Sequence, residues 1–291
     1  MNKDQIKAEA LIEALPYIQR FRGQTMVIKY GGAAMDNDEI VERVLRDIVF
    51  LEAVGINPVL VHGGGKAITR AMKERGVQAQ FIDGMRVTDL AQIDLIDQTL
   101  SSEINPSIVQ NIRNAGGKAT GFNGKHVLKA RKMRYVQAKT QQEVDLGYVG
   151  DIIGVHTQPL LEAIAHEEMP VISPIGSDDQ GNLYNINADV AAGEIAQALN
   201  AFKIIYLSDV NGVMRDPKQP DSTISHLTIA QIDRLKKEGI IDGGMIPKVD
   251  SAIEALESGV KKVHFLDGRI PHSLLLEIFT DAGIGTEITK D

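Results

Sequence analysis

Short apolar runs alternate with longer stretches of helical periodicity along most of the chain. Two runs rich in β-branched and aromatic residues, Thr25–Tyr30 and Asn57–His62, flank a stretch at residues 37–54 in which apolar side chains recur at helical spacing. A strand, a helix and a strand in this order predict a parallel βαβ unit. The same alternation predicts strands at residues 169–175, 203–208 and 261–266 and helices at residues 187–199 and 247–258. We therefore predict an α/β fold, a three-layer αβα sandwich with a mostly parallel open central sheet.

An amphipathic helix precedes the first strand. Its apolar residues recur at helical spacing, and the pattern stops near Pro16 and Arg22, so residues 1–22 should be appended to the domain formed by residues 23–291. No Pro/Ser-rich linker or internal repeat divides that domain. Two lobes that share one sheet, at about residues 23–175 and 176–291, fit this pattern better than two tethered domains. The short alternating segments within residues 80–88 and 118–154 predict hairpins that project from the sheet as candidate lids.

Charge and composition exclude several classes of function. The 291 residues carry a formal net charge of −8 and contain no long block of Lys or Arg, so nucleic acid is not an expected partner. An anionic ligand must instead be met by a few local cations and backbone N–H groups. The absence of cysteine excludes disulfides, thiolate zinc sites and cysteine nucleophiles, and it is typical of a reducing compartment, so we expect a cytoplasmic protein. No signal-peptide pattern and no apolar run of the ~18 residues needed to span a bilayer occurs, so we expect no membrane partner.

Two glycine-containing turns follow predicted strands. Lys29 ends the first strand before a glycine pair, at the edge of an α/β sheet where ligands bind, although a surface lysine before a turn would look the same. The second strand runs directly into His-Gly-Gly-Gly-Lys at residues 62–66, where successive N–H groups before a helix can converge on an anion; a tight turn alone would need only one glycine. Ala67 excludes a P-loop and Ile68 excludes a dinucleotide fingerprint. We interpret His62 as a hydrogen-bonded strand-end residue rather than a metal ligand, because no second histidine lies at ligand spacing.

Three further segments carry side chains suited to an anionic or amide-containing ligand. Arg86 follows a predicted hairpin turn, where its planar guanidinium could hold a carboxylate bidentately, unless it is simply solvated. Asn187 and Asp189 at the start of an Ala-rich helix are explained as an N-cap and a first-turn acid, but Asn185 is not. Lys248 lies in the first turn of another helix that follows a glycine pair. A cation there opposes the helix dipole, so something anionic should compensate it.

Five ordered motifs resemble the amino-acid kinase family: Lys-Tyr-Gly-Gly at 29–32, His-Gly-Gly-Gly at 62–65, Gly-Met-Arg-Val-Thr at 84–88, Asn-Ile-Asn-Ala-Asp at 185–189 and Gly-Gly-Met-Ile-Pro-Lys at 243–248. The resemblance covers residues 25–289 and is to the members that phosphorylate N-acetyl-L-glutamate in arginine biosynthesis. The helix at residues 1–22 is similar to the extra oligomerisation and regulatory helix of the arginine-inhibited, hexameric members. The implied reaction is ATP-dependent phosphorylation of the γ-carboxylate to N-acetyl-L-glutamyl 5-phosphate, the second step of arginine biosynthesis.

The resemblance also implies roles for individual residues. Lys29 and Lys248 would neutralise the transferring phosphoryl group and the leaving oxygen, and Asp189 would hold both lysines in place. Arg86 would bind the α-carboxylate of the substrate, and Asn185 would bind its acetylated amino-acid portion. Backbone N–H groups for phosphate and substrate would come from Gly64 and Gly65. The nucleotide would lie against Gly31, Gly32, Ser208, Asp209, Asn211 and Gly243.

The ligands and partners follow from the same resemblance. Mg²⁺ would arrive bound to ATP, since no compelling cluster of acids for a protein-held metal occurs in the sequence. Arginine would inhibit from a site between the appended helix and the C-terminal end, lined by Tyr17, Lys203, His264, Glu277 and Gly283. The expected assembly is a homohexamer, a trimer of dimers, and a nitrogen-signalling protein is a candidate partner.

Other activities stay open at this point. Carbamate, aspartate, glutamate and uridylate kinases share the fold and the lysine–glycine chemistry, but Arg86 within its motif and the run at residues 185–189 argue for acetylglutamate. A non-catalytic arginine sensor would not need Lys29, Lys248 and Asp189. A nicotinamide-dependent dehydrogenase is disfavoured by the missing fingerprint.

Overall fold

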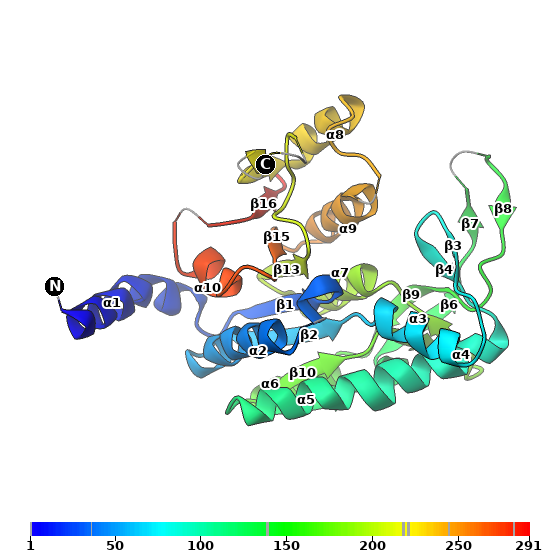
Figure 1. Cartoon of the computed structure of the whole chain (residues 1–291), viewed down its shortest axis with the longest axis horizontal. Helices are drawn as coiled ribbons and strands as arrows, with labels where there is room; N and C mark the ends of the chain where they lie inside the picture. The colour runs from blue at the N-terminus through cyan, green and yellow to red at the C-terminus, as the bar shows by residue number, and fades with distance from the viewer. Residues whose placement is uncertain are drawn as a thin grey trace.

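A computed structural model describes residues 2–35, 37–137, 140–216, 219, 222–243, 245–281 and 283–291. Its centre is an eight-stranded sheet with helices on both faces (Figure 1). The strand order is β14 (His226–Thr228), β16 (Thr286–Thr289), β15 (Lys262–Asp267), β13 (Lys203–Ser208), β1 (Thr25–Tyr30), β2 (Asn57–His62), β10 (Met169–Ile172) and β5 (Ala119–Phe122). Neighbouring strands run parallel except β15 and β16. The predicted αβα sandwich with a mostly parallel open sheet is confirmed.

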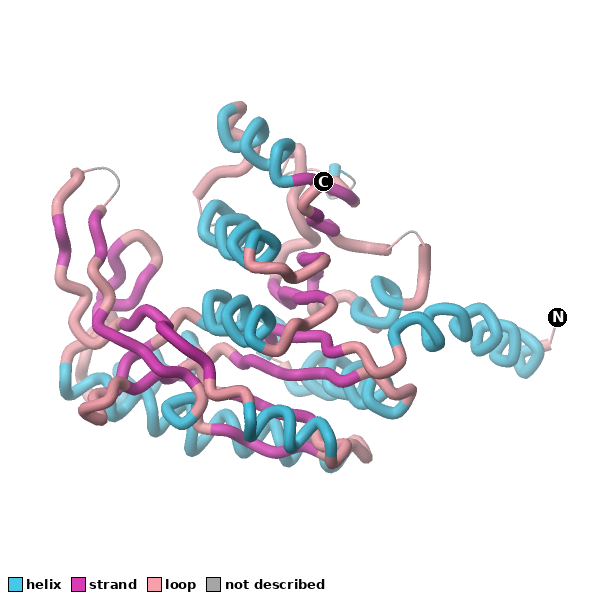
Figure 2. The backbone as a smooth tube through the Cα atoms, turned by 180° about the vertical axis from the view of Figure 1, so that it is seen from behind, coloured by secondary structure: helices cyan, strands magenta, loops and turns pink. Residues whose placement is uncertain are grey.

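Each face of the sheet has its own hydrophobic core. The helices α2 (Asp38–Ala53), α5 (Asn105–Asn114) and α10 (Ser273–Ile278) cover one face. The helices α6 (Gln158–Ala165), α7 (Ala188–Ala198), α8 (Ile229–Lys237) and α9 (Met245–Glu257) contribute to the core on the other face, which Figure 2 shows from behind. Side chains alternate along a strand. Met26 and Ile28 therefore pack toward α2, whereas Val27 belongs to the other core, and Lys29 projects toward the same side as Val27.

A second sheet and two hairpins stand beyond the carboxyl ends of β1 and β2. The four-stranded sheet has the order β12 (Leu183–Asn185), β11 (Ile175–Ser177), β6 (Leu128–Lys132) and β9 (Gly150–Val155). The hairpins are β3 (Gln80–Ile82) with β4 (Met85–Val87) and β7 (Tyr135–Val136) with β8 (Glu143–Val144), and both project from the body (Figure 1). Asp83 and Gly84 have φ angles of 48° and 83°, as a two-residue hairpin turn requires. The hairpin predicted at residues 80–88 is confirmed.

Two expectations about strands were wrong. The predicted strand at residues 169–175 ends at Ile172, and Ile175 already begins β11 in the smaller sheet. Pro174 lies between them, and a proline cannot donate to a strand ladder. Within residues 118–154, β5 is not part of a projecting hairpin but pairs with β10 at the edge of the main sheet.

The remaining helices frame the cavity described below. α3 (Gly65–Glu74) follows the glycine turn directly, and short 3₁₀ turns, η1 (Gly32–Met35) and η3 (Gly124–His126), follow β1 and β5. α4 (Leu90–Asp97), the π-helical segment η2 (Gln98–Ile104) and α5 form one continuous rod. The sequence pattern did not reveal this rod.

The appended helix is present within the predicted residues 1–22. α1 (Lys3–Phe21) begins at an Asn2 capping box, continues through Pro16 and extends away from the body (Figures 1 and 2). Its apolar side chains Ile6, Leu11, Ile12 and Leu15 are exposed. Among the described helices, α1 included, none is both long enough and apolar enough to cross a membrane.

Candidate active site

A cavity of about 1170 Å³ opens at the carboxyl ends of β1 and β2. Lys29 of β1, the glycine turn at residues 63–65, Arg86 of β4 and Asn185 of β12 all line it. Residues predicted from four separate motifs therefore surround one space. This position, outside the carboxyl ends of parallel strands, is where open α/β sheets bind their ligands.

An ion pair with Asp189 holds the ammonium group of Lys29 in place beside this cavity. Lys29 Nζ lies 2.9 Å from Asp189 Oδ1, and the two side chains are only 14% and 18% exposed. Asp189 lies in the first turn of α7, where Asn187 caps the helix by accepting a hydrogen bond of 2.8 Å from the Asp189 N–H. The predicted cap is confirmed. Both partners are thus held by regular elements, so the ammonium group has a defined position.

The glycine turn presents the start of α3 to the same cavity. The Gly63 N–H donates to the Tyr30 carbonyl at 2.7 Å, which ties the turn to the end of β1. Gly64 is the N-cap of α3, and among the described residues no side chain caps this helix. The backbone N–H groups of Gly64 and Gly65 can therefore bind an anion, and the helix dipole adds partial positive charge there.

His62 is a neutral residue that forms a hydrogen bond with the glycine turn. Its Nδ1 lies 2.8 Å from the Gly63 carbonyl, and Asn105 Nδ2 lies 3.3 Å from its Nε2. These partners assign the proton to Nδ1, which donates, and leave Nε2 to accept from Asn105. Complete burial lowers the pKa of His62 to about 4. The geometry matches the predicted strand-end residue.

Arg86 is held rigidly at one wall of the cavity. Its Nη2 donates to the Gly65 carbonyl at 3.0 Å and to Thr69 Oγ1 at 2.9 Å, and the guanidinium lies 4.7 Å from the centroid of the Phe81 ring. The residue is 8% exposed, and burial lowers the pKa of its guanidinium. Arginine nevertheless keeps its charge in proteins. The guanidinium of Arg86 is therefore hydrogen-bonded directly to the glycine turn.

Asn185, another residue that lines the cavity, contacts Thr88. The Asn185 side-chain amide lies 3.4 Å from Thr88 Oγ1, and its backbone N–H donates to the Tyr148 carbonyl at 2.8 Å. These contacts connect the end of β12 to the segment after β4. The amide of Asn185 is a cavity-lining group that capping does not explain.

Lys248 and part of the predicted nucleotide site lie outside the large cavity. Lys248 is in the first turns of α9, which packs on α7, and Ser251 Oγ donates to the Asp189 carbonyl at 3.3 Å. No ion pair joins Lys248 to Asp189 within the described ranges, so the predicted bridge between both lysines is present only on the Lys29 side. Gly244 of the same motif lies outside the described residues.

The other predicted nucleotide residues lie at or after the carboxyl ends of β1 and β13, which pair in parallel, except Gly243, which precedes α9. Ser208 ends β13, and the carbonyl of Asp209 accepts a hydrogen bond from Arg269 at 2.7 Å. Gly32 lines the large cavity, and the Lys29 side chain lies against Gly31. Asn211 is half-buried, whereas Gly243 is exposed with φ of 49°.

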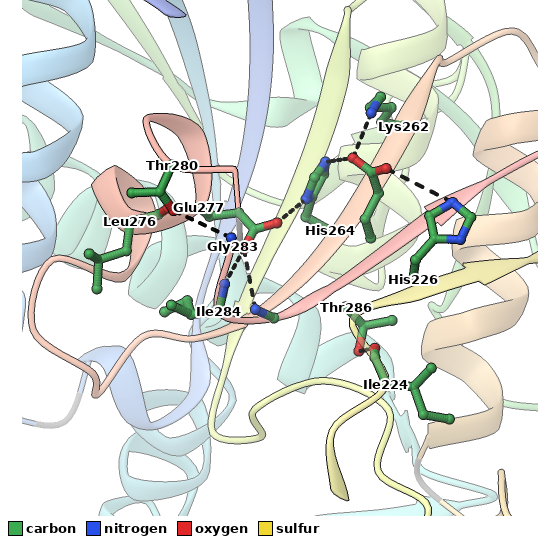
Figure 3. Close-up of polar contacts among 12 residues, drawn as sticks. Ile224, His226, Lys262, His264, Leu276, Glu277, Thr280, Gly283, Ile284 and Thr286 are labelled. Atoms are coloured by element: carbon green, nitrogen blue, oxygen red, sulfur yellow. Dashed lines mark hydrogen bonds and ion pairs between the residues drawn. The ribbon is translucent and has the colours of Figure 1, made fainter. Parts of the chain in front are cut away.

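A second, smaller cavity of about 280 Å³ lies between α1 and the C-terminal strands. All five predicted effector residues line it: Tyr17, Lys203, His264, Glu277 and Gly283. His264 Nδ1 lies 2.6 Å from Glu277 Oε1, and Glu277 Oε2 accepts from the backbone N–H groups of Ile284 and Gly285 (Figure 3). Burial by itself raises the pKa of Glu277, but His264 and these two N–H groups lower the pKa to about 2.

Burial lowers the pKa of the predicted residue Lys203 to about 8. Sequence reasoning missed two further charged residues of this second cavity, Lys262 and Glu287. The His264 Nε2 lies 3.4 Å from Glu287 Oε2, and Lys262 pairs with the same carboxylate at 2.7 Å. Glu287 faces His264 because β16 runs antiparallel to β15 in that register. The alternation of Thr286–Thr289 was the available signal, but β16 was not predicted as a strand.

Anion-binding groups from separate segments around one crevice of a parallel sheet define an α/β protein with a phosphate or carboxylate site. Residues 24–267 match the amino acid kinase family, and the chain belongs to this family. It is 48% identical over 290 residues to an acetylglutamate kinase of Methanococcus aeolicus, covering 98% of this chain and 99% of the relative. It is 49% identical over 286 residues to an acetylglutamate kinase of Moorella thermoacetica, covering 97% of each.

Solved structures show the same fold. An N-acetylglutamate synthase from Neisseria gonorrhoeae, complexed with coenzyme A and N-acetyl-glutamate, superposes with a TM-score of 0.85 at 27% identity over 98% of this chain. This chain spans 63% of that synthase. A complex of the same synthase with coenzyme A and L-arginine gives a TM-score of 0.82 at 26% identity, covering 98% of this chain and 65% of that one. A carbamate kinase from Giardia, at 20% identity and a TM-score of 0.67, covering 92% of this chain and 99% of that one, shares the fold.

Proposed function

We propose that this chain phosphorylates the γ-carboxylate of N-acetyl-L-glutamate with ATP, giving N-acetyl-L-glutamyl 5-phosphate in the second step of arginine biosynthesis. The observation that carries this proposal is the Lys29–Asp189 pair, 2.9 Å long, beside an uncapped glycine turn and a locked arginine in one cavity. Relatives named acetylglutamate kinase, up to 49% identical over nearly the whole chain, support the choice of substrate.

The chemistry of the reaction suits this set of groups. A side-chain carboxylate has a reference pKa of about 4.3, so the nucleophile is already ionised at neutral pH and needs no general base. What the reaction needs is alignment of two anions and stabilisation of charge on the phosphoryl oxygens. Lysines and preorganised backbone N–H groups supply that stabilisation.

Individual roles follow from position in the cavity. Lys29 would contact the transferring phosphoryl group, with Asp189 as its fixed partner, and the N–H groups of Gly64 and Gly65 would bind phosphate and substrate oxygens. Arg86 would bind the substrate α-carboxylate through the guanidinium N–H groups that do not donate to Gly65 or Thr69. Asn185 would bind the acetylated amino group, since it projects a side-chain amide into the same space.

The nucleotide and the second lysine belong to the C-terminal half in this proposal. Residues of about 23–175 would form the lobe that binds acetylglutamate, and residues of about 176–291 would form the lobe that binds ATP. Lys248 would stabilise charge at the leaving oxygen. ATP would carry Mg²⁺ to the site, because no group of three or more His, Asp or Glu among the described residues is arranged to hold a metal.

Arginine is the proposed effector of the second cavity. A guanidinium would be met by Glu277 and Glu287, and a carboxylate by Lys203, all of which line that space. Arginine would then favour an open arrangement of the lobes. Titration of the assay with arginine tests this regulation, and unchanged activity at millimolar arginine contradicts it.

The exposed apolar side chains of α1 support assembly through this helix. Ile12 is 67% exposed on a helix that extends from the body, and such a surface is stable in water chiefly when another chain covers it. We propose that α1 joins dimers into a homohexamer in the cytoplasm and that a nitrogen-signalling protein is a further candidate partner. Light scattering of wild-type protein and of Leu11→Asp tests the assembly: the variant should form smaller particles.

One assay decides between the proposed reaction and its alternatives. ADP release is measured with N-acetylglutamate, glutamate, aspartate and carbamate under identical conditions. We expect turnover with N-acetylglutamate to exceed the others. Preferred turnover of another acceptor would assign the chain to a different activity of the family, and no turnover with any acceptor would favour a non-catalytic arginine sensor.

A further inference from the structure

The three glycines of the turn have different surroundings. A Cβ added at Gly63 would lie at an ordinary 3.5 Å from the Gly31 Cα, and one added at Gly65 would meet no atom within 4 Å. At Gly64 an added Cβ would overlap Leu100 Cδ2 and lie 2.8 Å from Ile104 Cδ1. Leu100 and Ile104 therefore leave no room for a side chain at Gly64.

Both neighbours come from the π-helical segment η2. Leu100 is 1% exposed and Ile104 is half-buried, and both also line the large cavity. π-helical turns are rare and occur frequently at functional sites. In the same segment, the buried hydroxyl of Thr99 has no hydrogen-bond partner among the described residues, so the segment adopts this geometry at an energetic cost.

Polar contacts anchor η2 on its other side. Ser101 Oγ donates to Asp97 Oδ1 at 2.7 Å and lies 2.8 Å from Ser173 Oγ. Asp97 in turn accepts from Asn123 at 3.0 Å and pairs with Lys125 at 3.2 Å. These groups belong to the connections after β5 and β10. These contacts fix the π-helical segment to the main sheet, and its side chains Leu100 and Ile104 pack against Gly64.

We propose that Leu100 and Ile104 are positioning residues that set the place of the Gly64–Gly65 backbone in the cavity. The bulk of these two side chains determines how far the turn and its N–H donors project toward a bound anion. Their effect on catalysis rests on the proposed function, because the donors matter only if an anionic substrate reacts there. The contact itself can be tested without activity.

The test is a rescue by second-site truncation. Gly64→Ala should lower kcat/KM for N-acetylglutamate by about 100-fold, as expected when reacting groups are displaced by about 1 Å. Leu100→Ala with Ile104→Val removes both clashing methyl groups. Adding Gly64→Ala to that pair should cost less than about tenfold relative to the pair alone. An equal cost of Gly64→Ala in both backgrounds overturns the proposal.

Thermal unfolding provides the readout that does not depend on the reaction. Gly64→Ala should lower the Tm in the wild-type background and change it much less in the Leu100→Ala/Ile104→Val background. If wild-type protein fails to phosphorylate N-acetylglutamate, the proposed function fails, yet this comparison still decides whether the two side chains set the position of the turn. Equal Tm losses in both backgrounds contradict it.

Two matched variants separate this contact from general effects. Thr99→Val alters the same π-helical segment by replacing only the unpartnered hydroxyl with a methyl group, so it should not reduce the cost of Gly64→Ala. Gly65→Ala adds the same methyl group one residue further, where no protein atom lies within 4 Å. Truncation of Leu100 and Ile104 should therefore leave its effect unchanged. Rescue of Gly65→Ala to the same degree would show a nonspecific loosening and overturn the proposal.

Discussion

Lys29 and Asp189 form an ion pair of 2.9 Å between a central strand and the first turn of a helix far away in the sequence. Side chains alternate between the two faces of β1, and Lys29 lies on the face that is covered by α7. Asp189 lies in the first turn of α7, two residues after the N-cap Asn187. Because both backbones are parts of regular elements, the pair needs little reorganisation when charge develops in the cavity. Such preorganisation is the main source of electrostatic stabilisation in enzymes.

Lys29→Ala should lower kcat by about 100- to 1000-fold, with a smaller change in KM, because the cation acts most strongly on the charge of the transition state. Asp189→Asn should lower kcat by about 10- to 100-fold, since Lys29 loses a charged hydrogen-bond partner. The double variant should be no worse than Lys29→Ala. Steady-state kinetics with both substrates check this, with exposed Lys73→Ala as the control. A change confined to KM would make Lys29 a simple binding residue.

Arg86→Lys should raise KM for N-acetylglutamate by about 10- to 100-fold, because a point charge cannot replace a planar guanidinium that contacts Gly65 and Thr69 and is proposed to bind the substrate carboxylate as well. KM for ATP should change little. The matched control is Arg75→Lys at the other end of α3, where the guanidinium contacts Gln98 at 3.3 Å. Unaltered affinity for N-acetylglutamate would remove Arg86 from the substrate site.

Sequence reasoning succeeded where a local pattern carries the information. β1, β2 and β13 were predicted with the observed bounds, because buried strands of a parallel sheet are continuous apolar runs between turn residues. Lys29 and the glycine turn meet at one cavity because the carboxyl ends of the parallel strands β1 and β2 share an edge, whereas Arg86 and Asn185 reach it from an antiparallel hairpin and from the smaller sheet.

The sequence pattern failed where tertiary contacts decide the outcome. The π-helical turn at Gln98–Ile104 breaks helical periodicity and depends on Ser173, which is distant in sequence. Glu287 joins His264 only through the antiparallel register of an edge strand. The clash that keeps Gly64 without a side chain likewise comes from Leu100, whose approach no local rule predicts.

Acid should destabilise the protein through His62. Burial lowers its pKa from 6.5 to about 4, so between these pH values the unfolded chain binds a proton that the folded chain does not. This contribution to stability is complete above pH 6.5 and is lost as the pH falls toward 4, by up to about 3 kcal/mol. Denaturant unfolding at pH 7 and pH 4.5 measures the loss. His62→Gln should reduce it, whereas His166→Gln at an exposed position should not; equal losses in all three proteins would contradict this origin.

Glu277→Gln should weaken inhibition by arginine at least about tenfold, because a neutral amide loses the charged hydrogen bond proposed for a guanidinium. The ratio of activity with and without arginine is the readout, since it corrects for any change in the uninhibited rate. Exposed Glu238→Gln serves as the control and should keep the wild-type ratio. Inhibition by arginine that survives Glu277→Gln unchanged would place the effector elsewhere.

Tyr206 and Ser251 connect the proposed second lysine to the Lys29–Asp189 pair. The Tyr206 hydroxyl lies 3.1 Å from Ser251 Oγ, and both hydroxyls approach the Asp189 carbonyl, at 3.4 Å and 3.3 Å. Ser251 lies about one turn after Lys248 on α9. The bridge therefore fixes α9 against α7, and with it the position of Lys248 relative to Asp189.

Tyr206→Phe and Ser251→Ala should each lower kcat by about 3- to 10-fold, the value of one hydrogen bond, while KM for N-acetylglutamate stays within about twofold. The two effects should not add, because either change breaks the same bridge. The control is Tyr184→Phe. It removes a hydroxyl that donates a hydrogen bond of 2.9 Å to Asp178 and does not contact α9 in that bond. If the double variant loses the product of the two single effects, Tyr206 and Ser251 act independently and do not position Lys248 as a unit.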